Sequence, residues 1–370
     1  MRDDDACPGA LQVHQAADGA LARLRLPGGM IAAAQLEALA HTATEFGNGT
    51  LELTVRGNLQ LRGVRDASAV AEAAAAAGLL PSPTHERVRN IVASPLSGRV
   101  GGLADVRPWV TELDAAIQAD PDLARLPGRF LFGIDDGRGD ISGLSADVGA
   151  HVLPDGVALL LAGRDTGVRL PPDGVVAALM AVARRFAEVR GKSWRIAELA
   201  DPSALVSDFD ATAPAGATFP PVLRPPVGWI AQDDGRVTLG GAIPLGVLAA
   251  RQAEFVAAID APVVITPWRA LLVCDLPDGV ADTSLRVLAP MGLVFDDNSP
   301  WLDISACVGS PGCEKSQADV RAEATRVVKE EAARLPSGHV HYVGCERACG
   351  SPPTGQVLVA TAEGFRPAPR

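Results

Sequence analysis

The sequence predicts an α+β protein in which one strand–turn–helix–strand unit occurs twice, together with two larger α/β segments. The first copy of the unit begins at Gly19 with G-A-L-A-R-L-R-L-P-G-G, and the second begins at Gly235 with G-R-V-T-L-G-G-A-I-P-L-G. In each copy an alanine-rich stretch with helical periodicity follows, and then a segment of strand-forming residues. Stretches with mixed helical and strand patterns lie between the copies and after the second one.

The repeat indicates an internal duplication. Pro27 of the first copy aligns with Pro244 of the second, and Thr54 aligns with Thr266. The same elements in the same order over ~45 positions favour duplication over a chance match. Two such units are expected to pair into one sheet about a pseudo-twofold axis.

Changes in composition along the chain predict four domains, which cover residues 1–79, 80–205, 206–285 and 286–370. The first and third contain the two copies, and the second is an α/β segment. A stretch rich in proline and alanine, residues 201–226, is typical of a linker. In the last domain a helix is expected over residues 317–335, opened by Ser316.

Charge and hydropathy exclude several classes of function. The 370 residues include 33 basic and 44 acidic side chains, a net charge of −11, which argues against general binding to nucleic acid or to a membrane surface. No 18-residue apolar run occurs, and the start, M-R-D-D-D, lacks the pattern of a signal peptide. We therefore expect a cytoplasmic protein whose six cysteines are not in structural disulfides.

Four of the cysteines form two pairs near the C-terminus, Cys307 and Cys313 in C-V-G-S-P-G-C and Cys345 and Cys349 in C-E-R-A-C. Four thiolates can hold a 4Fe–4S cluster or a zinc ion. The five-residue gap of the first pair is wider than zinc sites prefer, and its glycines let backbone N–H groups point at cluster sulfur, so a cluster is favoured. Zinc and unliganded thiols remain the alternatives.

The segment Leu51–Arg62 alternates apolar and polar residues and predicts a single long strand. Its polar face would carry Thr54, Arg56, Asn58, Gln60 and Arg62 over ~26 Å at ~3.3 Å per residue. A solvated face is the ordinary interpretation of such a strand. The long hydrogen-bond donors suit instead a large flat ligand with several carboxylates. The second copy carries no such face, so the first copy is expected to bind and the second to support it.

Other basic residues are weaker candidates. The segment H-E-R-V-R-N-I contributes His85, Arg87, Arg89 and Asn90, and L-P-G-R-F places Arg129 on an expected strand. Further cationic candidates are Arg164, Arg269, Lys315 and Arg347.

Together, T-V-R-G-N-L-Q-L-R-G, V-R-N-I, L-P-G-R-F and the two cysteine pairs resemble the nitrite/sulfite reductase superfamily over nearly the whole chain. The resemblance implies two duplicated ferredoxin-like half-domains around a basin in which sirohaem lies beside a 4Fe–4S cluster. It implies that the cluster ligands are Cys307, Cys313, Cys345 and Cys349, the last also bridging to haem iron. The implied tetrapyrrole- or substrate-binding residues are Thr54, Arg56, Asn58, Gln60, Arg62, Arg87 and Asn90, with Arg89 and Arg129 assigned to catalysis.

The sequence also departs from the reductases of that superfamily. Where they carry L-P-R-K-F-K, which supplies protons and positive charge, this chain has Arg129 at one lysine position and Leu131 at the other. The loss of a charged donor weakens the case for a six-electron reduction. This departure and the shorter chain resemble the cobalamin-pathway branch, whose members hydroxylate precorrin-3A at C20 with dioxygen and close a γ-lactone.

The resemblance therefore implies an iron–sulfur monooxygenase that acts on a tetrapyrrole, precorrin-3A. Its implied cofactors are the 4Fe–4S cluster and a mononuclear iron or sirohaem, with dioxygen and a reduced nicotinamide or ferredoxin as co-substrates. His85 is a candidate iron ligand. The alternatives are a sirohaem-dependent nitrite or sulfite reductase and, in another class, a non-catalytic electron carrier or zinc-stabilised binding protein.

Overall fold

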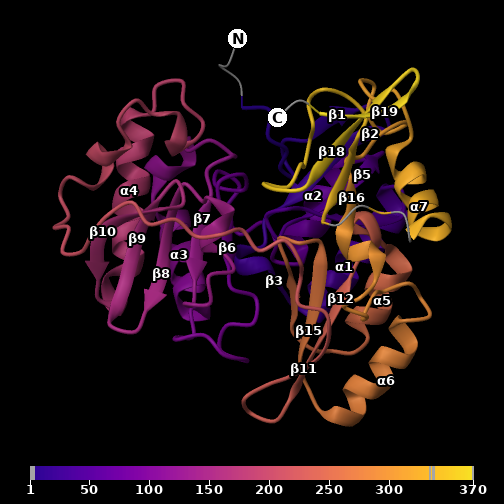
Figure 1. Cartoon of the computed structure of the whole chain (residues 1–370), viewed down its shortest axis with the longest axis horizontal. Helices are drawn as coiled ribbons and strands as arrows, with labels where there is room; N and C mark the ends of the chain where they lie inside the picture. Colours follow the sequence, from indigo (N-terminus) through magenta and orange to yellow (C-terminus); the bar gives the residue numbers. More distant parts are fainter. Residues whose placement is uncertain (1–4, 333–334, 336–337, 369–370) are drawn as a thin grey trace.

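The computed structural model describes residues 5–332, 335 and 338–368 (Figure 1). The first copy of the repeat forms an antiparallel sheet with two helices packed on it. Its elements are β1 (His14–Ala16), β2 (Gly19–Leu24), β3 (Met30–Ile31), α1 (Ala33–Phe46), β4 (Thr50–Leu53), β5 (Leu59–Val64) and α2 (Ala67–Ala76).

The second copy has the same order of elements, with one helix before its last two strands and one after them in the chain. Its elements are β11 (Gly228–Ala231), β12 (Val237–Ala242), β13 (Val247–Ala249), α5 (Ala250–Ala257), β14 (Val263–Ile265), β15 (Ala270–Leu276) and α6 (Asp278–Leu288). In Figure 1 it is the orange part at the lower right.

The two copies exchange a strand instead of joining into the one sheet expected from the sequence. The sheet of the first copy has the order β1-β2-β5-β4-β13, and that of the second has the order β11-β12-β15-β14-β3. Each short strand leaves its own copy directly after a Gly/Pro turn. At the first turn Gly29 is required, because a Cβ there would lie 2.0 Å from the Ile265 carbonyl oxygen.

Both copies share one hydrophobic core. The fully buried side chains of Leu36 and Leu59 belong to the same cluster as those of Leu248 and Leu271. Helices α1 and α5 pack on each other across the pseudo-twofold axis. Burying a leucine side chain stabilises a fold by ~1.5–3 kcal/mol, so the shared core couples the stability of the two copies.

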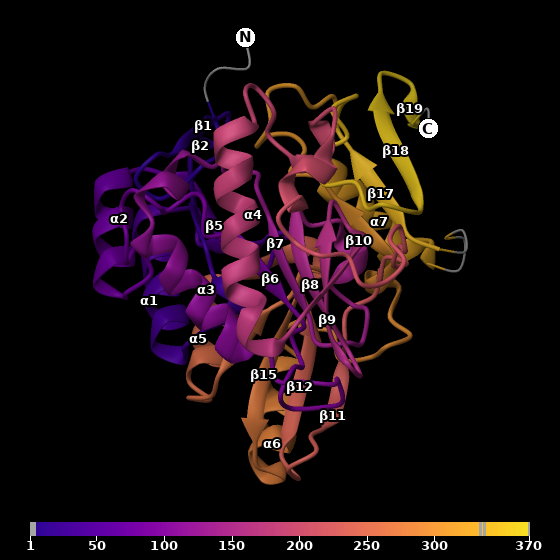
Figure 2. The same cartoon turned by 90° about the vertical axis from the view of Figure 1, so that its left-hand side faces the viewer.

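A third sheet, the magenta block on the left of Figure 1, has the order β10-β9-β8-β7-β6. Strands β6, β7 and β8 are parallel, and β9 and β10 follow antiparallel. Helix α4 lies on the sheet in Figure 2, beside α3. The elements are β6 (Ile91–Ala93), α3 (Arg107–Ala119), β7 (Phe132–Asp135), β8 (Val148–Leu153), β9 (Gly156–Leu161), β10 (Arg164–Leu170) and α4 (Val175–Val189).

The fourth sheet contains the cysteine segment and has the order β16-β17-β18-β19. As in the third sheet, its first three strands are parallel. Its elements are β16 (Ile304–Ala306), α7 (Val320–Glu330), β17 (Val340–Val343), β18 (Gln356–Thr361) and β19 (Gly364–Pro367). Helix α7 begins after Asp319, whose carboxylate caps the Ala322 N–H, so the start expected at Ser316 is wrong. Of its expected end, residues 333 and 334 lie outside the described residues.

The single strand expected over Leu51–Arg62 is also wrong, because the chain reverses in the middle. Strands β4 and β5 form an antiparallel hairpin with Glu52 opposite Gln60. The Thr54 N–H donates to the Asn58 carbonyl at 2.9 Å, and Gly57 takes the positive φ of 64° that the turn needs. Gly-Asn is a turn signal that overrides the alternation on either side of it.

Within the part of the chain that the structure describes, no helix is both long and apolar enough to cross a membrane.

Candidate functional site

A cavity of about 440 Å³ lies where all four sheets meet. Its walls come from the turns of both repeat copies, the loop after β7, the linker, and the ends of β16 and β17. Two indole rings, Trp268 and Trp301, and several prolines make the walls flat and apolar. Three guanidinium groups, those of Arg56, Arg195 and Arg269, also line it. This volume and lining are typical of a site for a small molecule.

The turns of the two copies enter the cavity in the same way. The Thr54 hydroxyl accepts from the Asn58 N–H at 3.1 Å, and the Thr266 hydroxyl accepts from the Ala270 N–H at 3.2 Å. The second turn places Arg269 where the first has Gly57, at a φ of 58°. The turn of the second copy thus also supplies part of the cavity wall, and the division into a binding and a supporting copy stays a prediction.

The cavity is cationic although the chain as a whole is acidic. No Asp or Glu occurs among the described residues that line it. Within the described part of the chain, neither Arg56 nor Arg269 has an ion-pair partner, whereas Arg195 is bound by Asp147 at 2.6 Å. Burial, and then the neighbouring Arg195, lower the pKa of Arg56 to about 10. Unpaired guanidinium groups at a buried site favour a ligand that carries carboxylates.

The four cysteines lie near one another and close to this cavity, although none of them is among its lining residues. Burial raises the pKa of the Cys349 thiol, and the nearby thiols of Cys307, Cys345 and Cys313 raise it further. Four neighbouring thiols could hold either a 4Fe–4S cluster or a zinc ion.

Glycines shape the cysteine loops for such a centre. The Gly344 N–H points at the Cys307 sulfur at 3.3 Å, and a Cβ at Gly344 would lie 1.8 Å from the Ser316 hydroxyl. Backbone donors aimed at sulfur tune the reduction potential of an iron–sulfur cluster. Ser305, on the strand that leads into the first cysteine pair, and Gly350, directly after Cys349, line the cavity. The four thiols thus fit a cluster held beside a bound ligand.

Arg62 ties the hairpin to the first cysteine loop and does not line the cavity. Its guanidinium donates to Asp18 at 2.7 and 2.9 Å and to the Gly312 carbonyl at 2.8 Å. Gly312 directly precedes Cys313. In the structure Arg62 supports the first cysteine loop. It is not among the residues that line the cavity, so its expected contact with a tetrapyrrole stays a prediction.

The uncharged residues of the expected strand build the hairpin and its neighbours. Asn58 accepts from the Leu26 N–H at 2.8 Å and donates to Asn90, which donates to the Gly128 carbonyl at 3.0 Å. Gln60 donates to Glu52 at 2.6 Å. Together with Thr54 in the turn, these residues position Arg56, the one member of the expected binding set that lines the cavity.

Three of the other basic candidates contact groups away from the cavity. Arg87 donates to the Asp5 carbonyl, Arg89 forms a two-bond pair with Asp114 on α3 at 2.6 and 2.7 Å, and the Arg129 guanidinium lies 4.5 Å from the centre of the Trp194 ring. Arg129 precedes β7 instead of lying on it. His85 is buried and bonded to the Asp120 carbonyl at 2.9 Å. The structure does not bring these side chains to the cavity, so their catalytic and ligand roles stay predictions.

Sequence reasoning missed several lining groups. Arg195 and Trp301 stand in segments without a motif, and only the folded chain brings them to the site. Ser305 and His339 also line the cavity. The sequence H-V-H at residues 339–341 alternates polar and apolar residues at the start of a strand. This pattern could have predicted that both histidines lie on one face, since every second residue of a strand shares a face.

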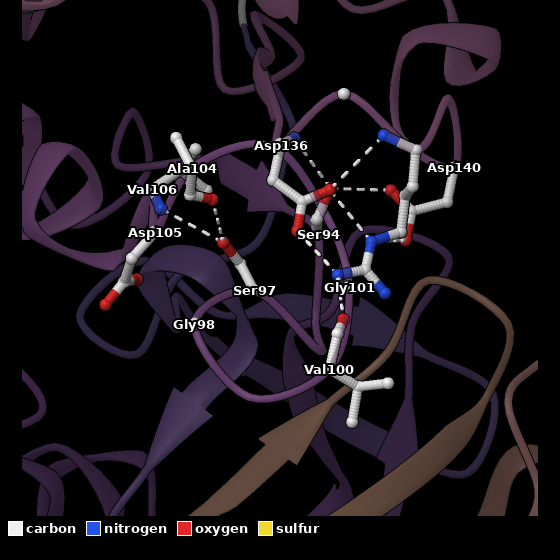
Figure 3. Close-up of polar contacts among 12 residues, drawn as sticks. Ser94, Ser97, Gly98, Val100, Gly101, Ala104, Asp105, Val106, Asp136 and Asp140 are labelled. Atoms are coloured by element: carbon white, nitrogen blue, oxygen red, sulfur yellow. Dashed lines mark hydrogen bonds and ion pairs between the residues drawn. The ribbon is translucent and has the colours of Figure 1, made fainter. Parts of the chain in front are cut away.

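The loop after β7 is fixed by an acidic network (Figure 3). Asp135 accepts four backbone N–H groups, and its pKa stays well below its usual range mainly because these bonds and His151 outweigh the cost of burial. Asp136 binds Arg138, and Asp140 accepts from Ser94 at 2.6 Å. This network holds the loop whose continuation, residues 143–145, forms part of the cavity wall.

Comparisons with known proteins agree with this architecture. Residues 14–77 match the nitrite/sulfite reductase ferredoxin-like half domain. The chain is 30% identical over 385 aligned positions to a precorrin-3B synthase from Sinorhizobium sp., across 97% of this chain and 81% of that protein. It is 35% identical over 127 positions to a ferredoxin–nitrite reductase from Synechococcus elongatus, across 32% of this chain and 25% of that protein.

The structure of the NirA protein of Mycobacterium tuberculosis has a TM-score of 0.76, with 22% identity, over 94% of this chain and 73% of that one. The predicted α+β fold with ferredoxin-like half-domains is therefore confirmed. The fold and the thiol-bordered cavity define an oxidoreductase of the nitrite/sulfite reductase superfamily. Within that superfamily, the chain belongs to the precorrin-3B synthase family.

Proposed function

We propose that the chain catalyses the precorrin-3B synthase reaction, in which precorrin-3A is hydroxylated at C20 with dioxygen and a γ-lactone closes from a ring acetate. The chain would act as an iron–sulfur monooxygenase in the cytoplasm, with a reduced nicotinamide or ferredoxin as electron source. The relative of that name covers most of the chain, which supports this reaction over others of the superfamily.

The observation that carries the proposal is the wall formed by Leu131. This apolar side chain lines the cavity at a position where reductases of the superfamily carry a lysine. A six-electron reduction of a small anion needs charged proton donors at the reacting atom. A hydroxylation of a large macrocycle takes up only two protons and also needs a shaped apolar wall, which Leu131 and Trp268 supply.

The residues of the chain have separable roles in this proposal. Arg56, Arg195 and Arg269 bind the acid arms of the macrocycle by charge-assisted hydrogen bonds. Trp268, held by a 2.7 Å bond from its indole N–H to the Val222 carbonyl, packs against the ring and excludes water.

Cys307, Cys313, Cys345 and Cys349 hold the 4Fe–4S cluster, which when bound supplies electrons one at a time. The segment that follows Cys349 lines the cavity, so a ligand bound in it would lie near the cluster.

The alternative function is that of a sirohaem-dependent nitrite or sulfite reductase. Matches to nitrite reductases over about a third of the chain and the likeness to NirA favour it as the second candidate. In that case the same cavity would hold sirohaem as a cofactor rather than precorrin-3A as a substrate.

Oxygen-isotope labelling tests the proposal. Anaerobically purified protein is supplied with precorrin-3A, a reduced ferredoxin or nicotinamide donor, and ¹⁸O₂, and the products are resolved by mass spectrometry. We expect the product to gain one labelled oxygen atom. A purified protein with a bound haem and a Soret band that consumes nitrite or sulfite, and leaves precorrin-3A unlabelled, would establish the reductase instead.

A further inference from the structure

The two parallel strands β16 and β17 divide their side chains between two faces. Ile304 and Tyr342 belong to the core that α7 covers. The alternate residues face the other way, and Ser305 stands opposite His341 in the strand register. On this second face lie the cavity and the loop that contains Cys349, because Ser305 lines the cavity and His341 contacts Cys349.

Three hydrogen bonds connect the polar side chains of this face in a row. His339 Nε2 and Ser305 Oγ are 2.7 Å apart, Ser305 Oγ and His341 Nδ1 are 2.7 Å apart, and His341 Nε2 lies 3.0 Å from the Cys349 carbonyl oxygen. His341 is fully buried and Ser305 is buried. The row therefore runs from the cavity wall at His339 to the backbone of the second cysteine pair.

The direction of each bond follows from its last acceptor. A carbonyl oxygen only accepts, so His341 carries its proton on Nε2 and its Nδ1 is an acceptor. Ser305 must then donate its hydroxyl proton to His341, and its remaining lone pair accepts the proton of His339 Nε2. This order fixes the tautomer and the ring orientation of His339, and it leaves Nδ1 as the atom at which His339 gains and loses a proton.

His339 also differs chemically from every other lining residue. The other ionisable groups on the described cavity wall are the guanidinium groups of Arg56, Arg195 and Arg269, which do not release a proton near neutral pH. The serine hydroxyls of the wall do not ionise in that range either. An imidazole is the side chain suited to proton transfer at neutral pH, and a third group that orients it is typical of catalytic bases and acids.

We propose that His339 is the proton donor of this cavity, and that Ser305 and His341 are positioning residues that hold its ring in one tautomer. The inference rests on the proposed function for its substrate. Transfer of one oxygen atom from dioxygen to the substrate takes up two electrons from the reduced donor and two protons, and it releases one water molecule. His339 gives one of these protons and takes one back from solvent in each turnover, and the reduced donor or solvent supplies the other.

The charged and polar groups around His339 set its proton affinity. Burial and the Arg269 guanidinium lower the pKa of His339 below its ordinary value of 6.5, while Asp303 and a hydrogen bond to the backbone of Leu302 raise it. His341, the other imidazole of the row, has its pKa lowered to about 3, mainly by burial, and stays neutral. A donor with a lowered pKa gives up its proton readily.

The test compares His339→Gln with the wild-type holoprotein and with His41→Gln, a matched change at an exposed position on α1. The probe is uroporphyrin III, an octacarboxylate porphyrin, and its binding is followed by quenching of tryptophan fluorescence between pH 5 and 8. In wild type and in His41→Gln, affinity should rise several-fold as the pH falls through the His339 pKa, since the imidazolium adds positive charge. His339→Gln should lose this rise and bind within about 2-fold of wild type at pH 8.

Turnover of precorrin-3A gives the second readout. Wild-type turnover at saturating substrate should fall as the pH rises above the His339 pKa, and His339→Gln should lower it ~100-fold or more with no such pH dependence. Ser305→Ala should move the wild-type profile toward lower pH, because it removes a bond that stabilises the imidazolium.

Two results would overturn the proposal. One is a pH dependence of probe binding that survives in His339→Gln. The other is a lower iron content in His339→Gln than in wild type, which would make His339 a metal ligand. A wild-type protein that leaves precorrin-3A unchanged would defeat the proposed function and with it the donor role in that reaction, whereas the probe-binding comparison would still show whether His339 is the group that titrates in the cavity.

Discussion

Arg269 has a strained backbone conformation, and its side chain lines the cavity. An L-residue with a φ of 58° costs ~1–2 kcal/mol relative to glycine, and the equivalent turn of the first copy uses Gly57 for this reason. The second copy nevertheless has arginine, whose guanidinium lines the cavity without an ion-pair partner among the described residues. Strain of this kind is typical of residues kept for a function.

Replacing Arg269 should therefore stabilise the protein and weaken its ligand binding. We expect Arg269→Gly to raise the free energy of unfolding by up to ~1 kcal/mol, because it relieves the backbone strain. The greater flexibility of glycine in the unfolded chain offsets part of this gain. Affinity for a porphyrin carboxylate should fall by ~1.5–3 kcal/mol, the range for a charge-assisted hydrogen bond. Urea unfolding and fluorescence titration measure the two effects. Arg269→Ala keeps the strain and should lose only affinity, and unchanged affinity in both variants would exclude Arg269 from the site.

Asp140 makes the stability of the acidic network depend on pH. Burial raises its pKa to about 7, and repulsion from Asp135 and Asp136 adds to this effect against the hydrogen bond from Ser94. Because the folded protein holds this proton more tightly than the unfolded chain, with its ordinary value of 3.8, the stabilisation it gives is lost as the pH rises toward 7.

Asp140→Asn should remove that dependence. An amide keeps an acceptor for Ser94 and carries no charge, so we expect the melting temperature of the variant to fall less than that of wild type between pH 5 and pH 8. Thermal unfolding followed by circular dichroism measures this. Parallel pH profiles for the two proteins would show that Asp140 is ionised throughout that range.

At the scale of single elements, the hairpin of β4 and β5 shows what alternation can predict. The polar residues do share a face, since Glu52 and Gln60 stand opposite each other across the hairpin. When two strands of a hairpin pair in register, the alternation of polar and apolar residues continues across the turn. The alternation therefore predicted the polar face correctly but predicted one long strand instead of two short ones. The turn at Gly57 was marked by composition, but the partner that makes glycine necessary there, Ile265, lies in the other copy.

Gly57→Ala should accordingly destabilise the fold more than glycine replacement at an open turn. A Cβ on Gly57 would lie 2.9 Å from the Ile265 carbonyl oxygen, in addition to the cost of the positive φ. We expect a loss of ~2 kcal/mol or more in the free energy of unfolding, measured with urea. Gly49→Ala is the control, because its φ is also positive, at 79°, and nothing lies within 4 Å of the added atom. Equal losses in both would contradict the close contact.

At the scale of the whole molecule, the sequence repeat predicted the internal duplication. The repeat did not predict the cavity. The lining residues run from Val55 to Pro353 along the chain. Motif reasoning found residues that build the walls, such as Asn58 and Arg62, because these hold neighbouring segments in place. It could not find Arg195 or Trp301, since their place in the wall depends on how separate domains pack.

The strand exchange predicts that the two copies lose stability together. Leu248 on β13 is fully buried in the shared core, and β13 belongs to the sheet of the first copy. Leu248→Ala should cost ~2–5 kcal/mol and speed amide hydrogen exchange in β4 as well as in β15. Leu159→Ala, a matched change in the separate core of the third sheet, should leave exchange in both copies unchanged. Faster exchange confined to the second copy would contradict the shared core.

The central claim is that four thiols hold an iron–sulfur cluster directly beside a cationic cavity for a tetrapyrrole. The most direct measurement is the electron paramagnetic resonance spectrum of the anaerobically reduced protein, recorded with iron and acid-labile sulfide analysis before and after uroporphyrin III is added. We predict about four iron and four sulfide per chain and a cluster signal that changes when the porphyrin binds. Bound zinc without sulfide, or a cluster signal unaffected by saturating porphyrin, would contradict the account.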